Sequence, residues 1–525
     1  MSTEYDSNSQ SSGPVAANVG DAIKRLEEEP GDEELLRRAE EAAGAIAFVH
    51  FDPSSARSSV IEALVHHGDL TKIHRGLYVL IFSTKDQRRY SGRIVEGPFY
   101  NPDALKRDST PIQFIILNQG KGKVLSVPEY HGWIRVEILG EERSGTLLGA
   151  VRRPHPASPV LPYDASMMSS MLNLDGDIRI GMLDNYEDVF VQIDSNNKGV
   201  IPRNWLTVGT IGSGKSNTTQ VFTEETLEAN YAQIVVDPEG EYIFMDRPSE
   251  SPSVEEDLEK FERAPQGVKS ITVYRPPGSE SKRTDAIEFS VPFDSLSPAE
   301  MKIYCHKYAI EPLTQDQHDA VSYGALMKKL RELQMMRLFD RKDAPMLDMV
   351  KLTQPGHLSV IDMSDSREQQ VVNIVIADLL ARVYHYKMGL TEEQNTERKV
   401  ILTIEEAHGF VSRDKKDRME QTLDQLRRIA RRGRKRWLAL HFVTQSPQHL
   451  PSELFELANN KIIHQTTGSE NLRVLKAAAG TVNEALWDDV PSLGRWRAIV
   501  VVSGQYPHPI MVQIRPAASR RNYTI

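Results

Sequence analysis

Cysteine is almost absent from this 525-residue sequence, which contains only Cys305. A single thiol cannot form an internal disulfide, and such scarcity is typical of proteins from a reducing compartment. Long apolar runs are also missing: none approaches the ~20 residues that cross a bilayer, and residues 1–13 are polar rather than signal-like. These absences predict a cytoplasmic protein without integral membrane association.

Positive charge is in deficit, because 63 basic residues face 73 acidic ones and the formal net charge is -10. The deficit is concentrated in residues 1–44, where eleven acidic and four basic residues leave a surplus of seven negative charges. The rest of the chain therefore carries only -3 of the total of -10. Because electrostatic attraction depends on the local field, basic patches there can still bind phosphate groups.

The length predicts two to four domains, at ~150 residues per domain. Residues 1–44 read as a disordered, acidic arm with short helical stretches. Residues 45–150 contain short strand patterns separated by Gly, Asn and Asp, which predict a small β-barrel. The strands expected there are 46–51, 77–82, 93–95, 112–117 and 133–139. Residues 151–177 are rich in proline and predict a linker.

Residues 178–515 alternate short apolar strands with helices, which predicts an α/β fold with a largely parallel sheet covered on both faces. The strand pattern stops at residues 297–352, where helix-starting sequences predict a helical insertion. Residues 516–525 are left as a C-terminal tail. Polar residues end nearly all of the strands, at the sheet edge where ligands of such folds bind.

A phosphate-binding loop follows the apolar strand 205–208 and matches G-x-x-x-x-G-K-[ST] at every fixed position. Its residues are Gly209, Thr210, Ile211, Gly212, Ser213, Gly214, Lys215 and Ser216. Lys215 is expected to reach the β- and γ-phosphates of ATP and Ser216 to ligate Mg²⁺, with the helix dipole adding positive potential. Asn217, the next helical residue, is predicted to join the ATP contacts.

Two adjacent carboxylates, Glu405 and Glu406, end the apolar strand 400–404. A P-loop hydrolase needs one carboxylate near Mg²⁺ and one beside the attacking water. We assign Glu405 to the metal and Glu406 to the water. The alternative is a strand end exposed to solvent.

Three further polar residues are candidates at strand ends. Asp237 and Glu241 follow the strand 233–237 and are predicted near the nucleotide, with a plain turn as the alternative. Gln445 follows the strand 438–443 and suits a γ-phosphate sensor, with a capped strand end as the alternative.

Residues 427–436 include seven basic side chains in ten positions. Three roles remain open for this run: an arginine finger or phosphate sensor, for which Arg434 is the candidate, a nucleic-acid contact, or solvated surface. A second basic cluster follows His408 and is assigned to DNA contact. It comprises Arg413, Lys415, Lys416 and Arg418.

The set of motifs, in this order, resembles the HerA family of DNA translocases within the HerA/FtsK class of P-loop ATPases. The motifs are 204–216, 237–242, 356–362, 404–408, 432–435 and 444–447. The resemblance implies a RecA-like core, an N-terminal HAS-barrel, and a homo-hexameric ring that moves double-stranded DNA and docks a NurA-like nuclease or an anti-phage effector. Two residues depart from the family pattern: Glu405 stands where many relatives have Asp, and Arg432 where an acidic or neutral residue is common.

Two functions are carried forward. The first is an ATP-driven, Mg²⁺-dependent translocase acting on double-stranded DNA in end processing or anti-phage defence. The second is a ring scaffold whose nucleotide site controls assembly and activates an effector with little translocation. A conjugation-type ATPase at a membrane is a weaker third possibility.

Overall fold

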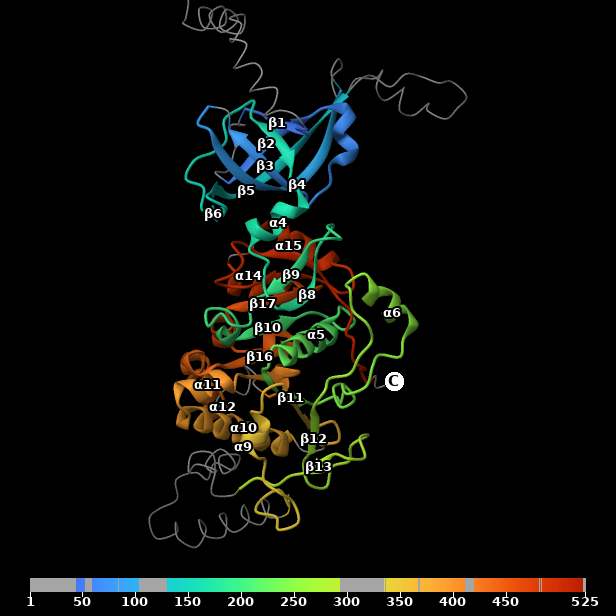
Figure 1. Ribbon diagram of the computed structural model, residues 1–525, viewed down its shortest axis with the longest axis vertical. Helices are drawn as coiled ribbons and strands as arrows, with labels where there is room; N and C mark the ends of the chain where they lie inside the picture. The colour runs from blue at the N-terminus through green and yellow to red at the C-terminus, as the bar shows by residue number, and fades with distance from the viewer. Residues whose placement is uncertain are drawn as a thin grey trace, which may run out of the picture. The chain divides into compact units, whose positions relative to one another are not determined.

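The computed structural model of the chain describes residues 44–51, 59–83, 85–102, 130–292, 335, 337–366, 369–410, 420–480, 482 and 484–522. It divides into two compact units, one built mainly from residues up to 163 and the other from residue 164 onward. Figure 1 shows the two units as ribbons. The N-terminal arm, the strand expected at 112–117, most of the helical insertion and the basic cluster at 413–418 lie outside the described residues.

The first unit is a small antiparallel β-barrel, as the sequence predicts. Its strands are β1 (Ala47–Val49), β2 (Val60–Val65), β3 (Tyr78–Ser83), β4 (Arg88–Pro102), β5 (Tyr130–Arg143), β6 (Thr146–Leu148) and β7 (Pro159–Pro162). The strand order is β2-β1-β7-β3-β4-β5-β6, and pairing between β2 and β5 closes the barrel. Alternate side chains such as Ile61, Ala63, Ile134 and Val136 are buried inside, following the two-residue period of a strand.

The linker predicted over residues 151–177 is wrong in part. Residues 159–162 form β7, which pairs with β1 and β3 inside the barrel. Proline takes only the two ends of this strand, so Val160 and Leu161 keep their backbone pairing. The other end of the proposed linker forms helix α4 (Ala165–Leu172), whose Leu172 is buried in the second unit.

The second unit contains a twelve-stranded sheet of order β13-β12-β14-β11-β15-β16-β10-β17-β18-β19-β8-β9. Its strands are β8 (Ile178–Leu183), β9 (Phe190–Ile193), β10 (Trp205–Val208), β11 (Ala232–Asp237), β12 (Ile271–Arg275), β13 (Ile287–Glu288), β14 (Leu358–Asp362), β15 (Val400–Ile404), β16 (Leu438–Thr444), β17 (Asn460–His464), β18 (Arg497–Val501) and β19 (Ile510–Ile514). Pairing is parallel from β13 to β17 and antiparallel from β17 to β9. The predicted α/β class with a parallel-rich sheet is confirmed.

Helices cover both faces of this sheet (Figure 1). They are α5 (Lys215–Glu228), α6 (Pro252–Glu259), α9 (Met349–Leu352), α10 (Gln369–Gly389), α11 (Glu392–Glu397), α12 (Glu420–Arg432), α13 (Ser452–Leu457), α14 (Ser469–Ala478) and α15 (Glu484–Asp489). Leu227 of α5 packs with Val235 and Val360 in one apolar cluster. Leu206 and Val208 pack in a larger cluster with α10 and α12. Most side chains of the central strands are therefore apolar, because neighbours bury them on both sides.

The C-terminal tail proposed from residue 516 is also wrong for its first residues. Ala517, Ala518 and Ser519 are buried. The backbone amide of Ala517 donates to Asn217 of α5 at 2.9 Å, and that of Ser519 donates to Glu224 at 2.8 Å. Small residues allow this close approach to the helix, so the chain continues as a packed segment.

Candidate nucleotide site

The glycine-rich loop connects β10, which lies between the parallel strands β16 and β17, to helix α5. Gly212 and Gly214 have φ angles of 81° and 116°, which side-chain-bearing residues rarely adopt. A Cβ on Gly209 would lie 2.5 Å from Ser213 Oγ and 2.7 Å from His464 Cβ. The loop thus needs glycine at these three positions for backbone geometry as well as for phosphate access.

Contacts from the adjacent strand hold the loop in place. The amide of Thr210 donates to the carbonyl of Gln465 at 2.8 Å, and Ser213 Oγ donates to the carbonyl of Thr210 at 2.7 Å. The amide of Trp496 donates to the carbonyl of Ser213 at 3.1 Å. Lys215 opens α5 and is buried, whereas Ile211 at the loop tip is exposed. The loop is thus preorganised around the N-terminus of a helix, where anions bind.

A buried histidine supports the first turns of α5. His464 Nδ1 lies 3.0 Å from the carbonyl of Arg497, so Nδ1 carries the proton, and Nε2 accepts from Thr218 Oγ1 at 2.8 Å. Burial, with a smaller effect from the charge of Lys215, lowers the pKa of His464 to about 4. His464 is therefore a neutral scaffold residue at physiological pH.

We predict that His464 makes stability pH-dependent. Its folded-state pKa is depressed, so its contribution is present above pH 6.5 and is lost as the pH falls toward 4, because the unfolded chain takes up the proton first. Between pH 7.5 and 5 the parent should lose about 2 kcal/mol relative to His464→Gln. Urea unfolding of both proteins at the two pH values measures this difference, and an unchanged difference would refute it.

Buried carboxylates line the ends of the adjacent strands. Asp237 on β11 pairs in register with Asp362 on β14, and Glu405 follows β15 beside them. The Tyr242 hydroxyl donates to Glu405 Oε1. Burial raises the pKa of Glu405 to about 8. The Tyr242 hydroxyl opposes this shift, while the nearby charges of Glu241 and Glu406 add to it.

Glu406 points elsewhere because its backbone is left-handed, with φ 47°. This conformation costs about 1–2 kcal/mol for a residue with a side chain. Glu406 Oε2 lies 3.1 Å from His408 Nδ1, which lies 3.1 Å from Thr444 Oγ1 on β16. The turn thus gives two adjacent carboxylates separate surroundings, as two separate roles require.

Two predicted ATP contacts have side chains that are bonded within the protein. Asp237 is fully buried and accepts backbone N–H groups of Gly240 at 2.8 Å and Tyr242 at 2.9 Å, so it holds its own turn. Asn217 donates to the carbonyl of Arg515 at 2.8 Å and accepts from Ala517. The contact of these two residues with ATP stays a prediction.

Glu241 forms an ion pair with Arg521. Arg521 belongs to the C-terminal segment that the sequence predicts to be a tail. Gln445 directly follows β16, half-buried, and Thr444 pairs with Val208 just before the glycine-rich loop. Gln445 thus lies at the predicted edge of the sheet.

Arg434 lies at the opposite edge. It belongs to the short 3-10 helix η6 (Gly433–Arg436) that precedes β16, and its Nε donates to the carbonyl of Lys198 at 3.1 Å. The seven residues of β16 separate it from the loop edge, a distance of roughly 20 Å at ~3.3 Å per residue. Arg434 therefore cannot reach a phosphate bound by its own chain.

The rest of the basic run makes mostly local contacts. The pairs are Arg427 with Glu453, Arg428 with Asp424, Arg432 with the Tyr384 hydroxyl, and Arg436 with the carbonyl of Leu390. With the contact of Arg434 to Lys198, five of the seven basic residues are thus bonded within this chain, although Arg434 and Lys435 are exposed to solvent.

Sequence reasoning missed several residues of the site. Tyr242 ends the predicted turn motif at 237–242, His464 belongs to none of the predicted motifs, and Arg521 lies in the predicted tail. Glu239 lies among the same charged groups. Burial and the negative charges of Glu241 and Glu406 raise the pKa of Glu239, whereas the positive charges of Lys215 and Arg521 lower it. The acidic turn motif at 237–242 indicates this part of the site in the sequence. A motif does not show which distant residues, such as Arg521, contact it.

A glycine-rich loop between a parallel strand and a helix, with paired carboxylates at the end of the next parallel strand but one, defines a P-loop ATPase. Residues 178–325 match the family model described as Helicase HerA, central domain. The DNA double-strand break repair helicase HerA of Saccharolobus solfataricus is 24% identical over 394 residues, covering 72% of this chain and 76% of that protein. Residues 178–325 therefore carry the features of a HerA central domain, and the chain is similar to HerA helicases over most of its length.

A second relative is similar over a comparable length. The probable DNA double-strand break repair helicase HerA of Methanocaldococcus jannaschii is 22% identical over 436 residues, covering 74% of this chain and 85% of that protein. Among solved structures, VirB4 of Thermoanaerobacter pseudethanolicus aligns with a TM-score of 0.41 and 16% identity, covering 65% of this chain and 96% of that one.

Among the helices that the structure describes, none has the length and apolar character needed to cross a membrane.

Proposed function

We propose that this ATPase is a Mg²⁺-dependent motor that moves along double-stranded DNA as a homo-hexameric ring. The observation that carries the proposal is the placement of Lys215 at the start of α5, at the same sheet edge as Glu405 and Glu406. We propose DNA as the substrate because the relatives are named as DNA double-strand break repair helicases.

The proposed chemistry begins with binding of the triphosphate. Amides of residues 209–216 and the ammonium of Lys215 bind the β- and γ-phosphates. The Ser216 hydroxyl and the Glu405 carboxylate are oxygen donors of the kind that Mg²⁺ prefers, so the residues present fit the ion. When bound, Mg²⁺ neutralises charge that develops on the phosphates. Ser216 and the ionised form of Glu405 would hold the ion.

The second step is activation of water. Glu406 orients the attacking water and accepts its proton, while His408 and Thr444 fix the side of the site from which Glu406 acts. Gln445, at the end of the adjacent strand, is placed to detect the γ-phosphate. Hydrolysis then changes the hydrogen bonds at the ends of β15 and β16 together.

The third step needs a second subunit. Arg434 lies at the sheet edge opposite the glycine-rich loop, so it can serve as an arginine finger only for a neighbouring copy of the chain. This geometry favours a closed ring in which one subunit's basic edge meets the next subunit's phosphates. A ring of six copies is our proposal from the family.

The experiment for this function is ATP turnover with and without linear duplex DNA. We expect duplex to stimulate turnover by the parent and Lys215→Ala to abolish it. The ring-scaffold alternative predicts turnover insensitive to duplex, with assembly and effector activation retained in Lys215→Ala. Duplex-independent turnover would therefore favour the scaffold.

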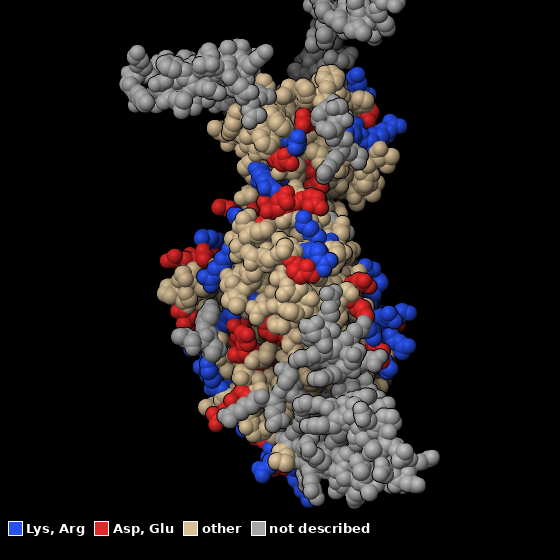
Figure 2. Space-filling view, turned by 180° about the vertical axis from the view of Figure 1, so that it is seen from behind, with Lys and Arg blue, Asp and Glu red and all other residues tan. Residues whose placement is uncertain are grey.

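On the face shown in Figure 2, basic and acidic side chains of the described residues are interspersed. The charge of those residues therefore does not indicate where DNA binds on that face. Arg413, Lys415, Lys416 and Arg418 remain our proposed DNA contacts.

We further propose that the barrel docks a protein partner, a NurA-like nuclease or another effector, in DNA end processing or anti-phage defence. An outward row crosses four strands, because Phe48 pairs with Leu64, Leu64 with Trp133, and Trp133 with Phe99. Phe99 stacks on Trp133 at 4.3 Å, and Phe48, Leu64 and Phe99 are each more than a third exposed. The barrel is closed, so an apolar row outside it has no core to enter, and a protein surface of matching apolar character suits it.

This docking surface has a direct test. Phe48→Asp should weaken capture of the protein encoded beside this chain in its genome by at least about tenfold, as loss of a buried aromatic anchor does. Lys72→Ala, on the exposed surface of the same unit, should leave capture unchanged. Full binding by Phe48→Asp would place the docking site elsewhere.

A further inference from the structure

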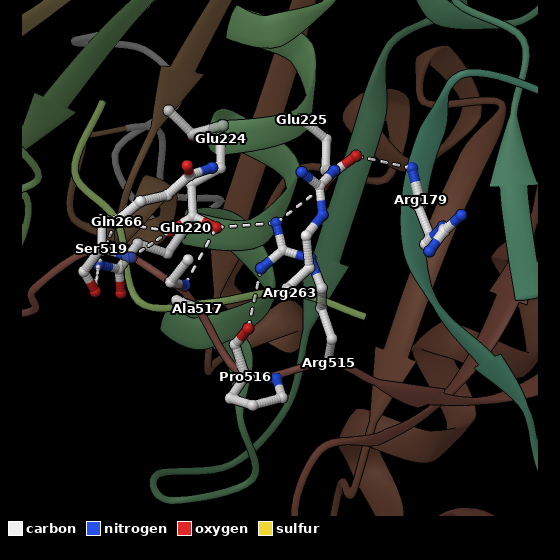
Figure 3. A network of polar contacts seen from close by, with 12 residues as sticks. Arg179, Gln220, Glu224, Glu225, Arg263, Gln266, Arg515, Pro516, Ala517 and Ser519 are labelled. Atoms are coloured by element: carbon white, nitrogen blue, oxygen red, sulfur yellow. Dashed lines mark hydrogen bonds and ion pairs between the residues drawn. The ribbon is translucent and has the colours of Figure 1, made fainter. Parts of the chain in front are cut away.

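The last described residues cross the nucleotide-binding unit as a packed strap, which we define as residues 515–522. Figure 3 shows its first part, from Arg515 to Ser519, against α5. The strap leaves β19 and follows α5, the helix that begins at Lys215, before it ends at the turn after β11. It therefore touches two segments that converge on the nucleotide site.

Buried charge fixes the strap to α5. Arg515 Nη2 lies 2.8 Å from Glu224 Oε2 and 2.8 Å from Glu225 Oε1, and Arg263 also pairs with Glu225 at 2.7 Å. The amide and hydroxyl of Ser519 donate to Glu224 Oε1 at 2.8 and 2.6 Å. Two buried carboxylates require such partners, because removing one partner leaves a costly buried charge. The strap is thus a fixed part of this unit.

The other end of the strap is bonded to the turn that follows β11. Asn522 donates through its amide to the carbonyl of Glu241 at 3.0 Å and through Nδ2 to the carbonyl of Gly240 at 2.8 Å. The guanidinium of Arg521 pairs with the Glu241 carboxylate. Tyr242, the next residue of the turn, donates to Glu405. One short path of bonded groups therefore joins Arg521 to the first of the two paired carboxylates.

The charge of Arg521 also reaches the site itself. It lowers the pKa of Glu239 in the same direction as Lys215, against the larger effect of burial. Arg521 and Lys215 thus act on a shared acidic turn.

We propose that Arg521 is a positioning residue for ATP hydrolysis, which acts by holding Glu241 and thereby fixing the turn that orients Tyr242 and Glu405. The inference rests on the proposed hydrolysis at this site. If Arg521 only stabilised the fold, replacing it would change the stability of the protein and leave the rate of ATP hydrolysis unchanged. A positioning residue affects the rate of the bound complex more than nucleotide binding, because misplacement of a reacting group costs rate.

The test compares Arg521→Gln and Arg521→Lys with Arg520→Gln in the full chain. Arg520 is a matched control, since it lies in the same strap and pairs with exposed Glu250 at 2.6 Å. We expect Arg521→Gln to lower kcat for ATP between about 10- and 100-fold with little change in KM, Arg521→Lys to recover part of it, and Arg520→Gln to match the parent. Parental kcat in Arg521→Gln, or a change confined to KM, would overturn the inference.

A second readout does not depend on turnover. Hydrogen exchange followed by mass spectrometry should show faster exchange across residues 237–245 in Arg521→Gln than in Arg520→Gln, with α5 unchanged. Equal exchange in the two variants also overturns the inference. Loss of the proposed function gives a different pattern, in which Lys215→Ala turns over ATP like the parent.

Discussion

Replacing Glu406 with Gln lowers ATP turnover between about 10²- and 10⁴-fold, because the amide cannot accept the proton of the attacking water. The substitution keeps the size of the side chain and leaves Lys215, Ser216 and the glycine-rich loop intact, so ATP binding is retained. Steady-state turnover and binding of a fluorescent ATP analogue measure the two quantities separately.

A matched control is Glu392→Gln, the same chemical change at an exposed carboxylate that pairs with Lys198. This variant should hydrolyse ATP like the parent. If Glu406→Gln also retains parental turnover, the water is activated by another group and the assignment of Glu406 is wrong.

The second large effect is expected at Arg434. Removing an arginine finger costs ~10³- to 10⁵-fold in rate in other NTPases, and we expect Arg434→Ala to fall in that range. Because Arg434 lies at the far edge of its own sheet, the loss can be repaired only by a neighbouring subunit.

Mixing two inactive proteins tests this arrangement. Arg434→Ala subunits keep an intact nucleotide site, and Lys215→Ala subunits keep an intact Arg434, so mixed oligomers should recover turnover that neither protein shows alone. Lys435→Ala, an exposed neighbour, should remain active. Mixed oligomers that form but stay inactive would remove Arg434 from the site.

Much of the second unit follows from the sequence because parallel strands buried on both faces are continuous apolar runs. Strands 205–208, 400–404 and 438–443 are of this kind, and β10, β15 and β16 match them to within one residue. The glycine-rich loop and the Glu405–Glu406 pair also follow, since their chemistry depends on residues adjacent in the chain.

Other features depend on contacts distant in sequence. Pro159 and Pro162 read as a linker because proline ends strands, yet they flank two residues that complete the barrel. Residues 516–519 have no periodicity, and only their contacts with Asn217 and Glu224 show that they are packed. The position of Arg434 required the strand order, which a list of motifs does not contain.

Displacement of a third strand from linear duplex DNA tests the central claim most directly. The parent with ATP and Mg²⁺ should strip a triplex-forming strand from the duplex, whereas Lys215→Ala, or the parent with a non-hydrolysable analogue, should leave it bound. If the parent hydrolyses ATP at full rate and the third strand stays in place, hydrolysis at this site does not drive movement along DNA.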